Sequence, residues 1–284
     1  MLHVIVPVHN RAAVTARFLD ALVAQTVTQF TLVLVDDGCT DDTIAIAREK
    51  LAVDRLTVLR GSGQLWWSGS LQLAYEHLLA GRLKDEDAVL IINDDVTFAP
   101  DFLARGTDAL HARPGACIQA MGIGRACGTI DRGAIADVVK LRFRAAGPGE
   151  APNCLSTRGL LMGARTFQRS GGFRPRWLPH YLSDYEFTIR LHRRGTPLVV
   201  DERFFATVDF SKTGLSAPAS GGLRQAWSDS FSNRAKFNPK HWTALAVLVC
   251  PLWVMPWRVT RIWAGFVRSM LVAARSETRS ASPS

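Results

Sequence analysis

Three apolar, strand-like runs in the first hundred residues each end in polar side chains. The runs cover residues 2–8, 31–35 and 88–92, and helical periodicity separates them. This alternation predicts an α/β protein with a mixed, mainly parallel sheet flanked by helices. The carboxyl ends of parallel strands lie along one sheet edge, where ligands bind. We therefore expect these polar residues to meet: His9 and Asn10, Asp36 and Asp37, and Asn93, Asp94 and Asp95.

Two adjacent carboxylates, Asp94 and Asp95, repel each other unless a cation compensates them. Hard oxygen ligands beside a diphosphate are what Mg²⁺ or Mn²⁺ prefers. A metal on the diphosphate of a leaving group stabilises the charge that develops as the bond breaks. Taken alone, an Asp-rich turn also fits a solvated loop. The preceding strand and the other two clusters favour a metal and nucleotide-diphosphate site.

Composition narrows the class of protein. A chain of 284 residues suits one large domain or two small ones. Most of the net charge of +9 lies after residue 232, where eight basic residues face one acidic residue. A basic segment rich in Trp favours an anionic membrane surface and disfavours nucleic acid. Five cysteines without C-x-x-C spacing favour a reducing cytoplasm, and no signal peptide is expected.

The C-terminal segment predicts a helix that lies on a membrane. Residues 242–257 carry no charge but are shorter than the about 20 residues that a span needs. Arg258, Arg261, Arg268 and Arg275 then share one helical face among apolar residues. We expect a catalytic domain at 1–240 and an amphipathic, membrane-associating segment at 241–284. The alternative is that this segment packs on the domain or on a homodimer partner.

Several segments follow one another in a recognisable order and spacing: residues 4–11, 33–43, 91–96, 158–163, 171–174, 182–187, 190–191 and Gly195. Together they resemble the family 2 glycosyltransferases of GT-A fold. The resemblance spans about residues 2–215, and its strength lies in the order and spacing of the matching segments. The other elements expected are strands at 117–121, 138–143 and 197–200, a turn and short helix within 160–172, and helices at 181–194 and 216–235.

The resemblance implies a role for each matching residue. Asp184 would be the general base that deprotonates the acceptor hydroxyl, with inversion at the anomeric carbon. Asp94 would approach the ribose, and Asp95 would bind Mg²⁺ or Mn²⁺. Asp36 or Asp37 would hydrogen-bond the base. The remaining residues of the nucleotide pocket would be Pro7, His9 and Asn10.

Some positions depart from the family pattern or stay open. Ser183 stands where the family often has Glu, so Glu186 is a candidate to share the base role or to support it. Asn93 replaces the usual first acid of the metal motif. Trp66 and Trp67 fit either a sugar platform or a core anchor. Two further candidates for the metal or phosphate side are Asp209 and Lys212.

These observations predict an inverting, metal-dependent enzyme that transfers a sugar from a nucleotide-sugar donor. The expected acceptor is a glycan or a polyprenol-linked glycan, and a Trp-Trp segment resembles rhamnosyltransferases of bacterial surface polysaccharides. The expected location is the inner face of the cytoplasmic membrane. One alternative is a nucleotidyltransferase of similar fold, although His9-Asn10-Arg11-Ala12 lacks the Gly-rich loop that such an enzyme needs. The other is a non-catalytic membrane-bound scaffold.

Overall fold

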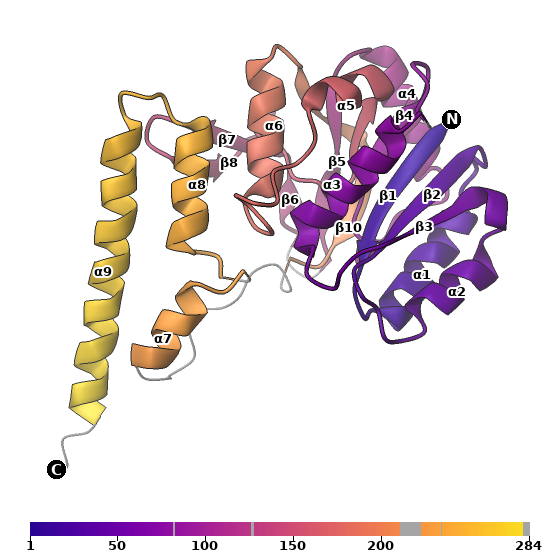
Figure 1. Cartoon of the computed structure of the whole chain (residues 1–284). Helices are drawn as coiled ribbons and strands as arrows, with labels where there is room; N and C mark the ends of the chain where they lie inside the picture. The colour runs from indigo at the N-terminus through magenta and orange to yellow at the C-terminus, as the bar shows by residue number, and fades with distance from the viewer. Residues whose placement is uncertain (82, 126–127, 211–222, 234, 281–284) are drawn as a thin grey trace.

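The computed structural model describes residues 1–81, 83–125, 128–210, 223–233 and 235–280 (Figure 1). A central sheet has the strand order β10-β5-β9-β4-β1-β2-β3, with β6 beside β5. Its strands are β1 (Leu2–Val8), β2 (Phe30–Asp36), β3 (Leu56–Arg60), β4 (Ala88–Ile91), β5 (Cys117–Gly124), β6 (Ile130–Asp131), β9 (Leu160–Gly163) and β10 (Leu198–Val208).

The sheet is mixed and mainly parallel, which confirms the predicted fold class. β1 pairs in parallel with both β2 and β4, β2 with β3, and β5 with β10. β9 runs antiparallel to its two neighbours, β4 and β5. All seven residues of β1 are buried, as expected for a strand covered on both faces.

Helices cover both faces of the sheet. One face packs against α1 (Ala12–Val23), α2 (Thr43–Lys50) and α4 (Phe102–Ala112). The other face packs against α3 (Trp66–Leu79), α5 (Ala164–Ser170) and α6 (Ser183–Arg193). A short 3-10 turn, Val53–Arg55, precedes β3. Two apolar cores thus sandwich the sheet and leave the strand ends for the site.

Two predictions for the middle of the chain are wrong in part. Of the strand predicted at 138–143, residues 138–141 form the turn between β7 (Ala134–Asp137) and β8 (Arg142–Ala145), and only residues 142 and 143 belong to a strand. There the Asp137 side chain accepts a hydrogen bond from the Lys140 backbone, 2.8 Å away, and Leu141 has φ +51°. Within 160–172, the predicted short helix is confirmed as residues Ala164–Ser170, but residues Leu160–Gly163 form β9, which pairs with β4 and β5, where a turn was predicted.

Three helices follow the sheet: α7 (Leu223–Ser230), α8 (Pro239–Val249) and α9 (Met255–Ser280). Of the helix predicted at 216–235, residues 216–222 lie outside the described part. α8 packs beside α6, where Leu245 and Val249 contact a cluster containing Leu178 and Ile189. α9 packs back against α8, so the two form a hairpin (Figure 1). No helix in the described part of the chain has the length and apolarity to cross a membrane.

Candidate active site

The three predicted clusters lie at one edge of the sheet, at the carboxyl ends of β1, β2 and β4. The register pairs Val8 with Asp36, which places the residues after β1 beside those after β2. His9 Nδ1 lies 2.7 Å from the Asp37 carbonyl oxygen. Asn10 adopts φ +50°, and its Oδ1 accepts a hydrogen bond from the Thr40 backbone at 2.7 Å. The first two strand ends are therefore bonded to each other.

The adjacent acids Asp36 and Asp37 have different partners. The Asp37 carboxylate accepts three backbone hydrogen bonds, from Gly63 at 2.8 Å, Leu65 at 3.1 Å and Trp66 at 2.9 Å. It therefore anchors the segment that leads from β3 into α3. Asp36 lies at the end of β2, and its Oδ1 accepts from the Cys39 backbone at 2.7 Å. Of the two acids, Asp36 has the more open position for hydrogen bonding to a base.

Arg11 joins the first strand end to the third. Its Nη1 lies 2.9 Å from Asp94 Oδ1, and its Nη2 lies 3.0 Å from Asp95 Oδ2. Asp94 is only 2% exposed, and its Oδ2 accepts from the Thr15 hydroxyl at 2.9 Å. Burial raises the pKa of Asp94, and the Arg11 charge opposes that rise. Asp94 therefore faces α1, whereas the side chain of Asp95 keeps 34% exposure.

The donor atoms at this edge fit a divalent cation that also binds a substrate diphosphate. Among the described residues, no three His, Cys, Asp or Glu side chains form a metal-binding cluster. Mg²⁺ commonly uses one or two carboxylates and completes its coordination with phosphates and water. Asp95 supplies one such carboxylate. Asn93 Oδ1 is shielded from solvent and accepts no hydrogen bond from the described residues, so it adds a hard oxygen nearby.

Asp184 lies in the first turn of α6, after Leu182 in the left-handed conformation with φ +69°. Its Oδ1 accepts a hydrogen bond from the Tyr185 backbone at 2.9 Å. Burial raises the pKa of Asp184 to about 6, against the opposing charge of Arg158. A carboxylate with a pKa near neutrality can accept a proton and then release it. The raised pKa of Asp184 is compatible with the base role that the resemblance implies.

Glu186 does not face the same way as Asp184. Residues two positions apart on a helix point to different sides. Glu186 is 2% exposed and forms ion pairs with Arg190 at 2.8 Å and Arg174 at 3.4 Å. These contacts place Glu186 in an arginine cluster on another side of α6, and they do not support a shared base role.

Trp67 has the contacts of a core anchor. Its Nε1 donates to the Thr157 hydroxyl at 3.0 Å, and its ring packs against the core between the sheet and α3. Trp66 precedes it with φ +58°, and its ring meets that of His180 edge-on at 5.8 Å. Trp67 therefore connects α3 to the segment before β9. A sugar platform formed by Trp67 stays a prediction.

Of the remaining predicted residues, the structure describes Pro7 and Asp209. Pro7 is buried in β1, opposite Val35. Asp209 directly follows β10. Lys212 lies outside the described residues.

Sequence reasoning did not assign roles to three charged residues at the site. Arg11 bridges the two acids after β4, as described above. Arg158 Nη2 lies 3.3 Å from Asp131 Oδ2. The Asp131 charge raises the pKa of Asp184, and the Arg158 charge lowers it. The one sequence signal for Arg158 was its place at the start of segment 158–163, which resembles the family. No sequence signal pointed to Asp131.

This sheet, with acids at its carboxyl edge and a further carboxylate in the first turn of a following helix, has the architecture of a GT-A glycosyltransferase. The sequence matches the model described as Glycosyl transferase family 2 over residues 3–201. The chain belongs to this family, as the resemblance predicted, and it is a glycosyltransferase. No curated protein sequence matches it.

Three solved structures illustrate the similarity of fold. A mannosyltransferase, PcManGT from Pyrobaculum calidifontis with GDP-Man and Mn²⁺, has a TM-score of 0.56 at 18% identity, over 100% of this chain and 76% of that one. S. aureus TarS 1-349 with UDP-GlcNAc has a TM-score of 0.57 at 16% identity, over 86% and 70%. GalNAc-T7 with UDP, GalNAc and Mn²⁺ has a TM-score of 0.58 at 12% identity, over 76% and 46%. At such low identities, the TM-scores show a shared fold and nothing finer.

Proposed function

We propose that this glycosyltransferase is inverting and metal-dependent, and that it moves a sugar from a nucleotide-sugar donor to a glycan or polyprenol-linked acceptor. The observation that carries the proposal is Asp184, whose pKa is raised to about 6 at the start of α6. The solved structures of similar fold that contain GDP-Man or UDP-GlcNAc support the donor class. The Trp66-Trp67 resemblance further favours a rhamnosyltransferase-like role in bacterial surface polysaccharide synthesis.

The donor nucleotide binds at the carboxyl ends of β1 and β2 in this proposal. Asp36 hydrogen-bonds the base, because Asp37 is engaged by three backbone N–H groups. Asp94 acts on the ribose side through Arg11, since both of its oxygens already have protein partners. The other residues that line the nucleotide pocket are Pro7, His9 and Asn10. Trp67 supports the wall of this pocket from α3.

The transfer step uses the chain's own acid and the acceptor. Asp184 takes the proton of the acceptor hydroxyl as that oxygen attacks the anomeric carbon. The bond from the anomeric carbon to the diphosphate breaks, and the nucleoside diphosphate leaves with the bonding electrons. Attack opposite the leaving group inverts the anomeric centre. Asp95 would hold the Mg²⁺ or Mn²⁺, and such a cation would supply charge stabilisation for the departing diphosphate.

The exposed side chains of α9 support a peripheral location at the cytoplasmic face of an anionic membrane. Val267 and Leu271 are 53% and 57% exposed, and Trp263, 37% exposed, continues the same row while its Nε1 donates to the Thr243 hydroxyl of α8 at 3.1 Å. Arg261 and Arg268 are also exposed on this helix. Exposed apolar residues beside cations are typical of helices that lie in a membrane interface. Because exposed apolar and charged side chains lie along the same helix, we expect α9 to lie on the membrane surface and not to span the bilayer.

Nucleotide release from a panel of nucleotide sugars tests the assignment. The wild type, Asp95→Ala and Asp184→Asn are compared with Mg²⁺ or Mn²⁺ present and an acceptor extract added. We expect one donor to give metal-dependent turnover that both substitutions abolish. Arg17→Gln on α1 is the matched control, since Arg17 is exposed and makes none of the contacts that build the site. Unchanged turnover in both site variants would refute the proposal.

A further inference from the structure

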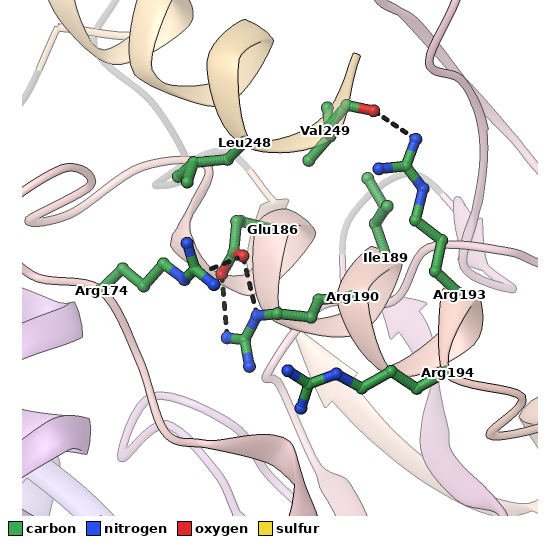
Figure 2. Close-up of a pocket in the computed structure, with 8 residues that line it drawn as sticks. All are labelled: Arg174, Glu186, Ile189, Arg190, Arg193, Arg194, Leu248 and Val249. Carbon is green, nitrogen blue, oxygen red and sulfur yellow. Dashed lines mark hydrogen bonds and ion pairs between the residues drawn. The ribbon is translucent and has the colours of Figure 1, made fainter. Parts of the chain in front are cut away.

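Four arginines converge on a cavity of about 130 Å³ beside α6 (Figure 2). Its walls come from α6, from the segment after α5, and from the C-terminal end of α8. None of its residues belongs to the active site described above. The lining residues are Arg174, Glu186, Ile189, Arg190, Arg193, Arg194, Leu248 and Val249.

The lining of this cavity carries an excess of positive charge. Glu186 is its one acidic residue, and it pairs with Arg190 through contacts of 2.8 and 3.0 Å. The Nε of Arg174 lies 3.4 Å from the same carboxylate. One carboxylate therefore faces four guanidinium groups. Like charges gathered in one place repel, and a bound anion relieves that repulsion.

Backbone carbonyl groups hold three of the arginines in place. Arg190 donates to the Gly172 carbonyl at 2.7 Å, and Arg194 Nη1 donates to the Arg169 carbonyl at 2.7 Å. Arg193 donates to the Val249 carbonyl at the end of α8. These contacts cap helix ends, and they also fix the guanidinium groups before any ligand arrives. Guanidinium groups fixed in this way suit the two-pronged recognition of a phosphate.

Arg174 and Arg194 have capacity beyond these structural contacts. The Arg174 side chain is 40% exposed, and its closest acidic contact, at 3.4 Å, is longer than a good charge-assisted hydrogen bond. Arg194 is exposed, and within the described part of the chain it donates through Nη1. Capping alone therefore does not account for the placement of Arg174 at this cavity.

One side of the cavity continues into exposed apolar residues. Leu248 and Val249 line it, and the chain then passes through Leu252, 81% exposed, and Trp253, 77% exposed. The connection from α8 to α9 thus places exposed apolar side chains next to the positively charged cavity. A ligand with a phosphate beside a hydrocarbon chain matches both features.

We propose that this cavity binds the phosphate of an anionic membrane lipid, with Leu252 and Trp253 entering the acyl region beside it. The cavity is separate from the active site and from the exposed apolar residues Trp263, Val267 and Leu271 of α9. It fixes which end of the α8–α9 hairpin meets the membrane, and it couples that contact to α6, the helix that carries Asp184.

Vesicle flotation of the full chain tests the proposal. The wild type is compared with the double variant Arg174→Gln, Arg194→Gln on vesicles of phosphatidylcholine alone and with added phosphatidylglycerol. The control is Arg17→Gln, Arg48→Gln, which removes the same charge from exposed positions on α1 and α2. Each arginine near an anionic surface contributes about fivefold in affinity. We expect about 25-fold weaker binding to the anionic vesicles in the cavity variant and little change in the control.

Equal losses in the cavity and control variants would overturn the proposal, because net charge alone would then explain binding. If the double variant does not fold in thermal unfolding, Arg174→Gln alone replaces it, with about a fivefold loss expected. Inorganic phosphate separates the two sources of this chemistry. Stabilisation of the wild type by inorganic phosphate, without any loss of vesicle binding in the variant, would contradict a lipid occupant.

The outcome is independent of the proposed enzymatic function, because flotation measures no turnover. A cavity variant that binds vesicles like the wild type overturns this site and leaves glycosyl transfer unaffected. A cavity variant that loses vesicle binding and keeps nucleotide release on a soluble acceptor supports the site as a membrane contact.

Discussion

The Nη2 of Arg11 lies 3.0 Å from the Oδ2 of Asp95. The same guanidinium group also contacts Asp94 at 2.9 Å, so one cation compensates both acids that follow β4. Asp95 is the proposed metal ligand, and a divalent cation at its carboxylate competes with Arg11. Arg11 and a divalent cation would therefore compete for one exposed carboxylate, that of Asp95.

Removal of Arg11 should tighten metal binding. Arg11→Met removes the competing cation, and partly exposed ion pairs contribute about 0.2–1 kcal/mol. We expect Mn²⁺ affinity, measured by calorimetry without donor, to rise by up to about fivefold. Asp95→Asn should abolish the same heat signal, and Arg17→Met should leave it unchanged. Weaker Mn²⁺ binding in Arg11→Met would show that Arg11 supports the metal site and does not compete with it.

The pH profile should report Asp184. A general base must be ionised, so kcat/KM should fall about tenfold per pH unit below the pKa of about 6. Arg158 lowers this pKa and Asp131 raises it. Arg158→Gln should therefore move the acid limb to higher pH, and Asp131→Asn should move it to lower pH. Shifts in the same direction for both variants would contradict an effect through Asp184.

Asp184→Asn should lose activity and gain stability. The pKa of about 6 exceeds the ordinary value of 3.8, so the folded state holds the proton more tightly than the unfolded state. The ionised carboxyl therefore lowers the stability of the wild type as the pH rises from about 4 to about 6. Above that window, the Asn variant should be about 1–3 kcal/mol more stable in urea unfolding. Turnover should fall by about 10²–10⁴-fold.

Asp37 should contribute mainly to the stability of the fold, and Asp36 mainly to donor binding. The Asp37 carboxylate accepts from the backbones of Gly63, Leu65 and Trp66, and it is 7% exposed. Asp37→Ala leaves these donors without that partner, and each lost hydrogen bond to a charged group costs about 1–3 kcal/mol. We expect at least about 2 kcal/mol of destabilisation in urea unfolding. Asp36→Ala should instead mainly raise the KM for the donor, with stability close to that of the wild type.

The sequence was sufficient to place the three clusters at one edge because strand periodicity and parallel topology determine where strand ends lie. The same reasoning failed for β9, a four-residue strand whose pairing with β4 and β5 arises only in the folded chain. Local pattern also gave no basis for separating Asp36 from Asp37. The difference comes from the segment after β3, which returns to bind one of them.

Charged partners distant in sequence were also beyond prediction. Arg11 and Asp95 are 84 positions apart, and no periodicity connects them. Asp131 and Arg158 likewise come together only in the folded chain. The ion pair of Glu186 with Arg190 lies within one helix, at a spacing of four, and is therefore of a kind that has a local sequence signal. Pairs formed by the fold have no such signal.

The position of the cut should decide how a C-terminal truncation behaves. The sequence places a boundary at residue 240, but Leu245 and Val249 of α8 pack with Leu178 and Ile189 of the catalytic domain. A chain ending at Lys240 exposes that core, so we expect aggregation or a lowered melting temperature. A chain ending at Val254 keeps α8 and loses α9, so it should stay folded and keep nucleotide release on a soluble acceptor. It should also lose most of its binding to phosphatidylglycerol vesicles in flotation. Full vesicle binding by the longer truncation would contradict the role of α9 at the membrane.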